Sequence, residues 1–361
     1  MHPEACIHPD AIQHNLNRVR SLAPKARVLA VIKADGYGHG LLRMARAMQT
    51  ADGLAVARLS EGIQLRQAGI DSRIVVLQGF ANHEELEGML HHRLIPVVHA
   101  EFQLKIIADH SWPTESLHPV WIKVDTGMGR LGLSPEQFAS LHPDTFRQAG
   151  YSVDCVMSHL ACADEPGNPF TVEQLARFES LPGWPAEISL ANSAALLDWS
   201  ERFPQLSSGW VRPGLMLYGL SPFSDRTGTD LGLRPAMTLA AHVIAVRNKK
   251  KGEPVGYGGE WCCPEDMCIG VVSIGYGDGF PRHVQPGTCV WIDGGPAEII
   301  GRVSMDMISI DLRQHPDVQV GDKVECWGPH LPVEILAAQS GTIPYELICQ
   351  LTPRVQRIEG S

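Results

Sequence analysis

The chain has 361 residues, of which 44% are hydrophobic and 19% are charged, which is enough apolar material for a substantial core and excludes a globally disordered protein. Its formal net charge is −10, and Lys249-Lys250-Lys251 is the only basic run, so the composition argues against a nucleic-acid-binding protein. No run of about 18 apolar residues occurs, which argues against a membrane span.

The cysteines and the amino-terminal residues indicate the cellular compartment of the protein. The nine cysteines are an odd number without C-x-x-C spacing, and the first residues lack the basic and apolar regions of a signal peptide. Together these features predict a cytoplasmic protein. The sequence has no H-E-x-x-H motif, and we expect no metal site.

The first 230 residues alternate short apolar runs with amphipathic stretches. A helix is expected at 10–21, before the first strand. The predicted strands are 28–32, 54–57, 74–78, 94–98, 120–124, 153–158, 187–190 and 210–218. The predicted helices between them are 41–49, 60–68, 82–91, 101–108, 134–141, 171–180 and 194–199, with Ser60, Asn82 and Ser134 as candidate caps.

These strands are apolar throughout rather than alternating, as in a parallel sheet buried on both faces. Eight strands with intervening helices predict an α/β fold, a (β/α)8 TIM-type barrel, with a doubly wound open sheet as the alternative. After Leu233 the helical signals fade, and short runs separated by Gly and Pro predict a mostly-β domain. We therefore expect a barrel domain at residues 1–233 and a mostly-β carboxyl-terminal domain at 234–361.

Lys33 ends an apolar strand and is followed at once by a glycine-rich loop, Ala-Asp-Gly-Tyr37-Gly-His-Gly40. The carboxyl ends of barrel strands face the active-site mouth, where partial desolvation lowers the pKa of a lysine and makes its amine nucleophilic. Lys33 is therefore a candidate Schiff-base lysine, although a lysine that simply caps the strand fits this segment as well. A Schiff-base lysine points to pyridoxal phosphate, which needs a phosphate cradle and a partner for its ring nitrogen.

Barrels often bind phosphate in the loops after strands 7 and 8. Here these strands lead to Asn192-Ser193 and to Arg212-Pro-Gly214, although Asn-Ser also serves as an ordinary helix cap. The segment from Gly127 to Gly132 matches G-x-G-x-x-G, but no acidic residue follows at the spacing of a dinucleotide site, so Arg130 is better interpreted as an anion contact. Tyrosines also stand within glycine-rich turns at Tyr257 and Tyr276.

Taken together, these segments resemble the alanine racemases over nearly the whole chain. The Lys33 segment is similar to that family's pyridoxal-phosphate attachment site. The other matching motifs are Lys123-Val-Asp-Thr-Gly-Met-Gly-Arg130-Leu-Gly, Ser158-His159-Leu-Ala, Asn192-Ser193-Ala-Ala, Val211-Arg212-Pro-Gly214, Gly256-Tyr257-Gly, Ile274-Gly-Tyr276-Gly-Asp-Gly, Gly301-Arg-Val-Ser-Met305-Asp306 and Pro344-Tyr345-Glu346. The resemblance implies a pyridoxal-phosphate barrel followed by a β domain, in a homodimer with shared active sites.

The resemblance also implies roles for single residues. Lys33 carries the cofactor as an aldimine, and Arg212 faces the pyridine nitrogen, with His159 behind it. The phosphate is held by Tyr37, Ser193, the backbone at Gly214 and Leu215, and Tyr345, and Asn192 is a further cofactor-binding residue. The substrate is met by Arg130 and Met305, with Tyr276 of the partner subunit and Asp306 narrowing the entrance. Lys123 matches a lysine that is carbamylated in many relatives.

The implied chemistry is racemisation of alanine by two bases on opposite faces, Lys33 and the partner subunit's Tyr257. A phenol, with an ordinary pKa of about 10, is a weak base near neutrality and needs a supporting hydrogen-bond chain, which His159 and Arg212 could supply. A guanidinium does not readily give up its proton, so Arg212 disfavours transamination. The enzyme would either supply D-alanine for peptidoglycan synthesis or degrade D-alanine.

Three alternatives remain: a pyridoxal-phosphate decarboxylase on the same barrel, a racemase of broader specificity, and a non-catalytic cofactor-binding protein. Tyr257 argues against the first, and the additional 130 residues after the barrel argue against the last. Ser304 stands where some relatives have cysteine, and the segment from Thr352 to Arg357 varies from theirs. Neither departure is expected to touch a residue with a named catalytic role.

Overall fold

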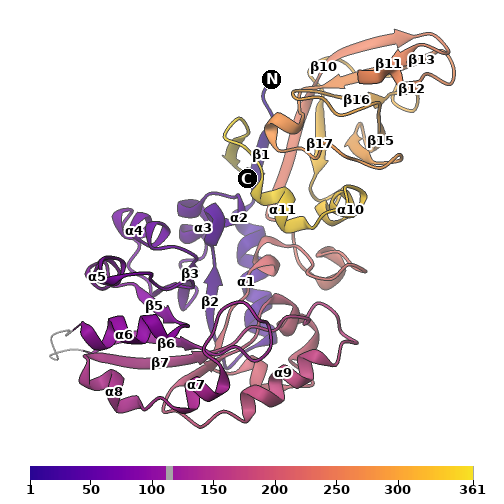
Figure 1. The fold of residues 1–361 in the computed structure, drawn as a ribbon. Coiled ribbons are helices and arrows are strands. Elements are labelled where there is room, and N and C mark those ends of the chain that lie inside the picture. Colours follow the sequence, from indigo (N-terminus) through magenta and orange to yellow (C-terminus); the bar gives the residue numbers. More distant parts are fainter. Residues whose placement is uncertain (111–116, 361) are drawn as a thin grey trace. The chain divides into compact units, whose positions relative to one another are not determined.

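The computed structural model describes residues 1–110 and 117–360 (Figure 1). The chain forms two compact units. We call the unit made of Leu16–Gly36 and Leu41–Leu217 the barrel unit. The other, made of Met1–Asn15, Tyr37–Gly40 and 218–360, we call the β-rich unit. The expected functional division at residue 233 stays a prediction.

The barrel unit contains eight parallel strands in the order β8-β7-β6-β5-β4-β3-β2-β9. Their bounds are β2 Arg27–Val31, β3 Gly53–Val56, β4 Ile74–Val76, β5 Ile95–Val98, β6 His118–Lys123, β7 Tyr151–Met157, β8 Glu187–Ser189 and β9 Trp210–Val211. The ends of β8 and β9 are joined by hydrogen bonds from Ser189 Oγ to the Trp210 carbonyl (2.7 Å) and from the Arg212 amide to the Ala191 carbonyl (2.9 Å). The predicted (β/α)8 barrel is therefore confirmed. The last strand is shorter than predicted, because the backbone after Val211 turns into a 3-10 segment, Leu215–Tyr218.

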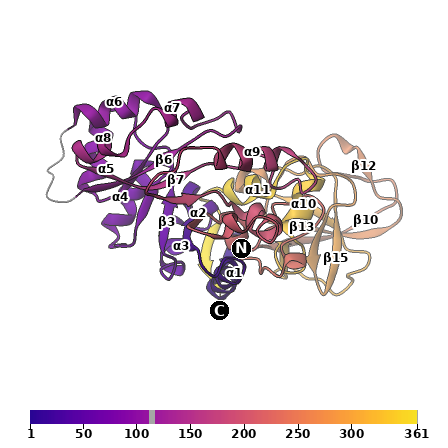
Figure 2. The same cartoon turned by 90° about the horizontal axis from the view of Figure 1, so that it is seen from below.

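Helices surround these strands, and α4, α5, α6 and α8 lie together on their outer side in both views (Figures 1 and 2). The helices are α1 Pro9–Leu22, α2 Lys33–Tyr37, α3 Leu41–Ala47, α4 Leu59–Gln67, α5 His83–His91, α6 Glu101–Asp109, α7 Pro135–Ala139, α8 Pro143–Gln148, α9 Phe170–Glu179 and a π-helical turn Ala195–Trp199. Asn82 and Ser134 cap α5 and α7 as predicted, by accepting hydrogen bonds from the backbone. Ser60 lies inside α4, whose amino-terminal cap is Arg58, so that cap prediction was wrong.

The β-rich unit is built on an eight-stranded sheet in the order β13-β16-β15-β14-β17-β10-β1-β18 and a two-stranded β11-β12 ribbon. The strands are β1 Glu4–Ile7, β10 Met237–Lys249, β11 Pro254–Val255, β12 Trp261–Cys262, β13 Met267–Val272, β14 Cys289–Ile292, β15 Gly295–Ile300, β16 Ile308–Asp311, β17 Lys323–Trp327 and β18 Gln356–Glu359. Two helices, α10 Val333–Gln339 and α11 Pro344–Cys349, complete it. The mostly-β character expected after residue 233 is thus confirmed.

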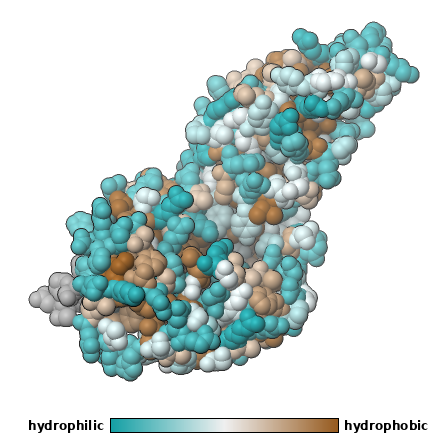
Figure 3. Space-filling model, in the orientation of Figure 1, coloured by the Kyte–Doolittle hydropathy of each residue, from teal (hydrophilic) through white to brown (hydrophobic). Residues whose placement is uncertain are grey.

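Hydrophilic residues are spread over the face shown in Figure 3, with smaller hydrophobic areas among them. Among the described residues, we find no helix with the length and apolar character needed to cross a membrane.

Candidate active site

Lys33 follows the last residue of β2 by two positions and is half-buried, as a residue at the carboxyl end of a barrel strand. The segment after it is a left-handed turn rather than an open loop. Ala34, Asp35 and Gly36 have φ values of 55°, 53° and 61°, and Tyr37 follows with 51°. Left-handed backbone costs about 1–2 kcal/mol for each residue other than glycine, so the surrounding protein must hold this turn in place.

Two carboxylates hold the turn. Glu61, from α4, accepts hydrogen bonds from the amides of Ala34 (2.8 Å), Ala57 and Arg58, while Asp35 Oδ1 accepts from the Leu41 amide (2.8 Å). Sequence reasoning missed Glu61, since nothing in its own segment indicates that it reaches across to the Lys33 turn.

Arg212 is buried at 4% exposure, just after β9. Its Nη1 donates to Ser189 Oγ and its Nη2 to the Ser158 carbonyl, both at 2.6 Å, so the guanidinium is fixed by groups at the ends of β7 and β8. His159 Nδ1 lies 3.5 Å from Nη2. Burial lowers the pKa of Arg212 to about 10, which leaves the group charged at neutral pH.

Lys123, the last residue of β6, is 7% exposed and faces several other cations. Burial, followed by Arg212, Arg130 and Lys33, lowers its pKa to about 8, against a smaller opposing effect of Asp125. The pKa of His159 is also well below its ordinary value, first because of burial and then because of the same cations and Lys123. The structure therefore brings Lys33, Lys123, Arg130, His159 and Arg212 into one electropositive cluster.

Ser193 and Gly214 meet in the barrel unit. Ser193 Oγ, at 4% residue exposure, accepts hydrogen bonds from the amides of Gly214 (3.0 Å) and Met216 (3.3 Å), and Leu215 lies between these two amides. Asn192 Oδ1 accepts from the Ala195 amide (3.0 Å) as a helix cap, and its contact with the cofactor stays a prediction.

Tyr37 and Tyr345 come together in the β-rich unit. Their ring centroids lie 6.0 Å apart, and Tyr37 also stacks on Tyr218 at 4.6 Å. Burial, with smaller contributions from Tyr345 and Cys349, raises the pKa of Tyr37 far above its ordinary value, so its hydroxyl keeps its proton.

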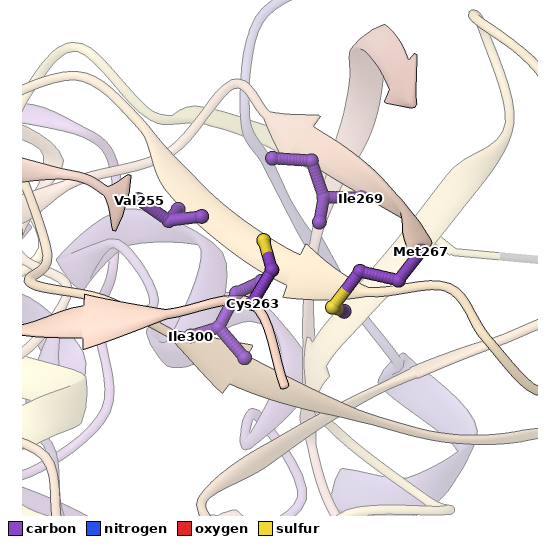
Figure 4. Close-up of a cluster of buried hydrophobic side chains, with 5 residues drawn as sticks. All are labelled: Val255, Cys263, Met267, Ile269 and Ile300. Atoms are coloured by element: carbon purple, nitrogen blue, oxygen red, sulfur yellow. The ribbon is translucent and has the colours of Figure 1, made fainter. Parts of the chain in front are cut away.

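Tyr257 lies in the turn between β11 and β12 and is 71% exposed. The turn stands beside a buried cluster of Val255, Cys263, Met267, Ile269 and Ile300, with Trp261 packed against it (Figure 4). The cluster anchors both ends of the turn through Val255 and Cys263, while Tyr257 itself is exposed.

Tyr276, Met305 and Asp306 lie on two adjacent turns of the β-rich unit. Tyr276 and Met305 are 39% and 52% exposed, and the Tyr276 amide donates to the Ser304 carbonyl (3.1 Å). Arg354, from the segment 352–357 that varies from the family, donates from Nη2 to Asp306 Oδ1 at 2.6 Å, so this segment contacts a residue predicted on the substrate side of the site. Sequence reasoning had no signal for this contact between residues 48 positions apart.

Comparison with known proteins gives a consistent result along the chain. Residues 7–222 match the family model described as the alanine racemase N-terminal domain, and residues 236–359 match the model described as the alanine racemase C-terminal domain. The chain is 48% identical over 356 residues to a protein named alanine racemase from Nitrosococcus oceani and 46% identical over 360 residues to one from Vibrio parahaemolyticus, with 98% of each chain covered in both comparisons.

Solved structures agree in fold. A biosynthetic alanine racemase from Pseudomonas aeruginosa has a TM-score of 0.92 at 38% identity, covering 100% of this chain and 99% of that one. An alanine racemase from Bartonella henselae, crystallised with covalently bound pyridoxal phosphate, has a TM-score of 0.87 at 29% identity and covers 100% of both chains.

Proposed function

Because the chain belongs to the alanine racemase family, we propose that it interconverts L-alanine and D-alanine with pyridoxal phosphate, using Lys33 and Tyr257 as its two bases. The observation that carries the assignment of residues is the electropositive cluster at the carboxyl ends of the barrel strands, with Arg212 fixed at its centre. We also propose that residues 1–233 act as the cofactor domain and 234–361 as the domain that contributes to the partner's active site.

The residues fit an anionic cofactor. Lys123 has an unusually low pKa because it is buried and Arg212, Arg130 and Lys33 surround it, and a bound phosphate would relieve this excess of positive charge. Ser193 and the amides of Gly214 and Leu215 would hold the phosphate, and the resemblance gives Tyr37 and Tyr345 the same role. When bound through Lys33, pyridoxal phosphate supplies an electron-withdrawing ring that acidifies the Cα–H bond of the amino acid.

Arg212 would face the ring nitrogen. Its pKa of about 10 keeps the guanidinium protonated at neutral pH, so it donates a hydrogen bond but keeps its proton. Ser189 and the Ser158 carbonyl hold it in that orientation. An arginine at the ring nitrogen favours return of a proton to Cα over transamination. His159, kept neutral by its surroundings, would connect Arg212 with Tyr257.

Racemisation removes the Cα proton on one face and returns one on the other. Lys33 Nζ would serve one face and Tyr257 Oη the other. A base that is 71% exposed would exchange its proton with bulk water rather than with a substrate, so its exposure supports an assembly in which a second copy of the chain covers it. We therefore propose a homodimer in which Tyr257 and Tyr276 act on the partner's active site.

Arg130 and Met305 would bind the substrate carboxylate, with Asp306 and Tyr276 narrowing the entrance. The pKa of Lys123 near 8 leaves a fraction of its amine neutral at pH 7, and a neutral amine is the form that reacts with carbon dioxide. We propose that Lys123 is carbamylated, which would replace one buried cation with an anion beside Arg130.

The nine cysteines are all free, and a cytoplasmic location would keep them reduced. In that compartment we propose that the enzyme supplies or degrades D-alanine, a peptidoglycan precursor.

The first test incubates the purified, cofactor-loaded protein with L-alanine in D2O and separates the enantiomers by chiral chromatography. We expect D-alanine carrying deuterium at Cα, loss of turnover in Lys33→Ala, and in Tyr257→Phe a loss of about a hundredfold or more with cofactor still bound. Inversion of L-serine or L-lysine without L-alanine would leave the mechanism and replace alanine with another amino acid as the substrate. Bound cofactor with no inverted amino acid would contradict the proposal.

A further inference from the structure

Arg354 joins two turns of the β-rich unit, and we propose that it is a positioning residue through which the entrance formed by Tyr276 and Asp306 selects substrates by size. The inference rests on the proposed function, and it adds a residue from the carboxyl-terminal segment to the substrate side of the site.

The guanidinium of Arg354 meets one carboxylate from each turn. Its Nη2 donates to Asp306 Oδ1 (2.6 Å), and its Nε lies 3.0 Å from Asp278 Oδ1. Asp278 is 1% exposed, and its other oxygen accepts a hydrogen bond from the Gly275 amide (3.0 Å), which closes the turn around Tyr276. Arg354 therefore contacts the Tyr276 turn through a buried carboxylate and the Met305–Asp306 turn through an exposed one.

The two turns are also packed backbone to backbone. The Gly277 amide donates to the Met305 carbonyl (2.8 Å), and a Cβ at Gly275 would lie 2.3 Å from the Ser304 carbonyl oxygen. At this distance a change in the position of one turn moves the other. A side chain that binds both turns therefore fixes the positions of Tyr276 and Asp306 relative to each other.

Arg354 is itself held in register by its neighbour Thr352. The Thr352 amide donates to the Asp278 carbonyl (3.1 Å), and its Oγ1 donates to the Gly277 carbonyl (3.0 Å). Arg354, Asp306 and Met307 border an open hollow of about 650 Å³ in the β-rich unit. The side chains of Arg354 and Asp306 are 50% and 53% exposed, so this half of the contact lies at an accessible wall.

An exposed ion pair such as Arg354–Asp306 contributes little to folding stability, so the contact with Asp306 has its main effect on position. The planar guanidinium fork can serve two carboxylates at once, whereas a lysine ammonium on a flexible stem cannot hold both in a fixed geometry. Arg354→Lys keeps a positive charge for the buried Asp278 and releases the link between the turns.

The test compares Arg354→Lys with Arg313→Lys as holoenzymes. Arg313 is a matched control, because it also joins two carboxylates in the β-rich unit, Glu265 and Asp311, each at 2.6 Å. The measured quantities are kcat and KM for L-alanine and L-serine, bound cofactor and Tm. We expect the preference for alanine, the ratio of the two kcat/KM values, to fall at least about fivefold in Arg354→Lys, through a lower KM for the larger substrate, L-serine, with bound cofactor and Tm unchanged. Arg313→Lys should match the wild type.

A second comparison keeps the test decisive if the Arg354→Lys variant folds poorly. Asp306→Asn removes the charge from the other side of the same contact, and adding Arg354→Lys to it should change the preference little further. An unchanged preference in Arg354→Lys and Asp306→Asn, or an equal loss for both substrates, would overturn this inference while leaving an active wild type and the proposed function intact. A wild type that inverts neither amino acid would overturn both.

Discussion

The folded protein destabilises the charged form of Lys123. Its ammonium is 7% exposed and close enough to Arg212, Arg130 and Lys33 for them to lower its pKa. The folded pKa, near 8, lies below the value of about 10.4 for a lysine in the unfolded chain. Below pH 8 the group is protonated in both states, and the cost of the buried charge is fully present. Between the two pKa values the unfolded chain binds more protons, so stability rises with pH.

In bicarbonate-free buffer we expect the free energy of unfolding to rise between pH 8 and 10.5 by up to about 3 kcal/mol more in the wild type than in Lys123→Met. Urea unfolding of both proteins across this range measures the difference, and the comparison cancels the titration of the other groups. Parallel pH profiles for the two proteins would contradict it. Added bicarbonate at pH 7 should stabilise only the wild type if Lys123 forms a carbamate.

For single residues, the sequence predicts the position in the fold when the neighbouring residues along the chain determine that position. Lys33 and Arg212 follow apolar strands, so both could be placed at the carboxyl end of the barrel. The contacts of Ser189 and Arg354 could not be predicted, because their partners are 23 and 48 positions away. A single hydroxyl or guanidinium group in a sequence also fits many other structural roles.

The left-handed turn after β2 is the element that sets the direction of the Lys33 segment. Glycines at 36, 38 and 40 made a turn predictable, and all three have positive φ. Ala34 and Asp35 in the same conformation were not predictable, since residues with a Cβ adopt it only when external contacts such as those of Glu61 compensate. Strand β1 escaped prediction for a related reason: it has four residues, and its partners β10 and β18 lie more than 200 positions away.

The strain at Ala34 predicts that Ala34→Gly stabilises the protein. Glycine adopts φ near 55° without the Cβ clash, and we expect a gain of up to about 1 kcal/mol after the greater entropy of the unfolded chain is subtracted. Ala45→Gly is the control, because Ala45 is buried within the regular helix α3, where the same change should cost at least about 1 kcal/mol from helix propensity and the lost methyl group. Thermal and urea unfolding measure both variants. Destabilisation by Ala34→Gly as large as that by Ala45→Gly would mean that the turn is not strained.

At the scale of the whole molecule, the barrel was predictable because eight apolar runs recur at regular spacing, and the strand order then follows from right-handed parallel connections. The assembly is different. The exposed fractions of Tyr257, Tyr276 and Met305 are 71%, 39% and 52%, which indicates a surface that is incomplete in one chain, but the identity of what covers it comes from the family resemblance rather than from any pattern in the sequence.

Mixing two inactive variants tests whether each active site draws on two chains. In Lys33→Ala and in Tyr257→Phe every site of the proposed homodimer is defective. If Tyr257 acts on the partner, a dimer with one chain of each kind contains one site with both bases intact and one with neither. Random exchange in an equal mixture should therefore restore about a quarter of the wild-type activity. If Tyr257 acted within its own chain, each chain of the mixed dimer would keep its own defect and the mixture would stay inactive. Mixing Lys33→Ala with Lys33→Arg is the control, because no exchange can restore the lysine.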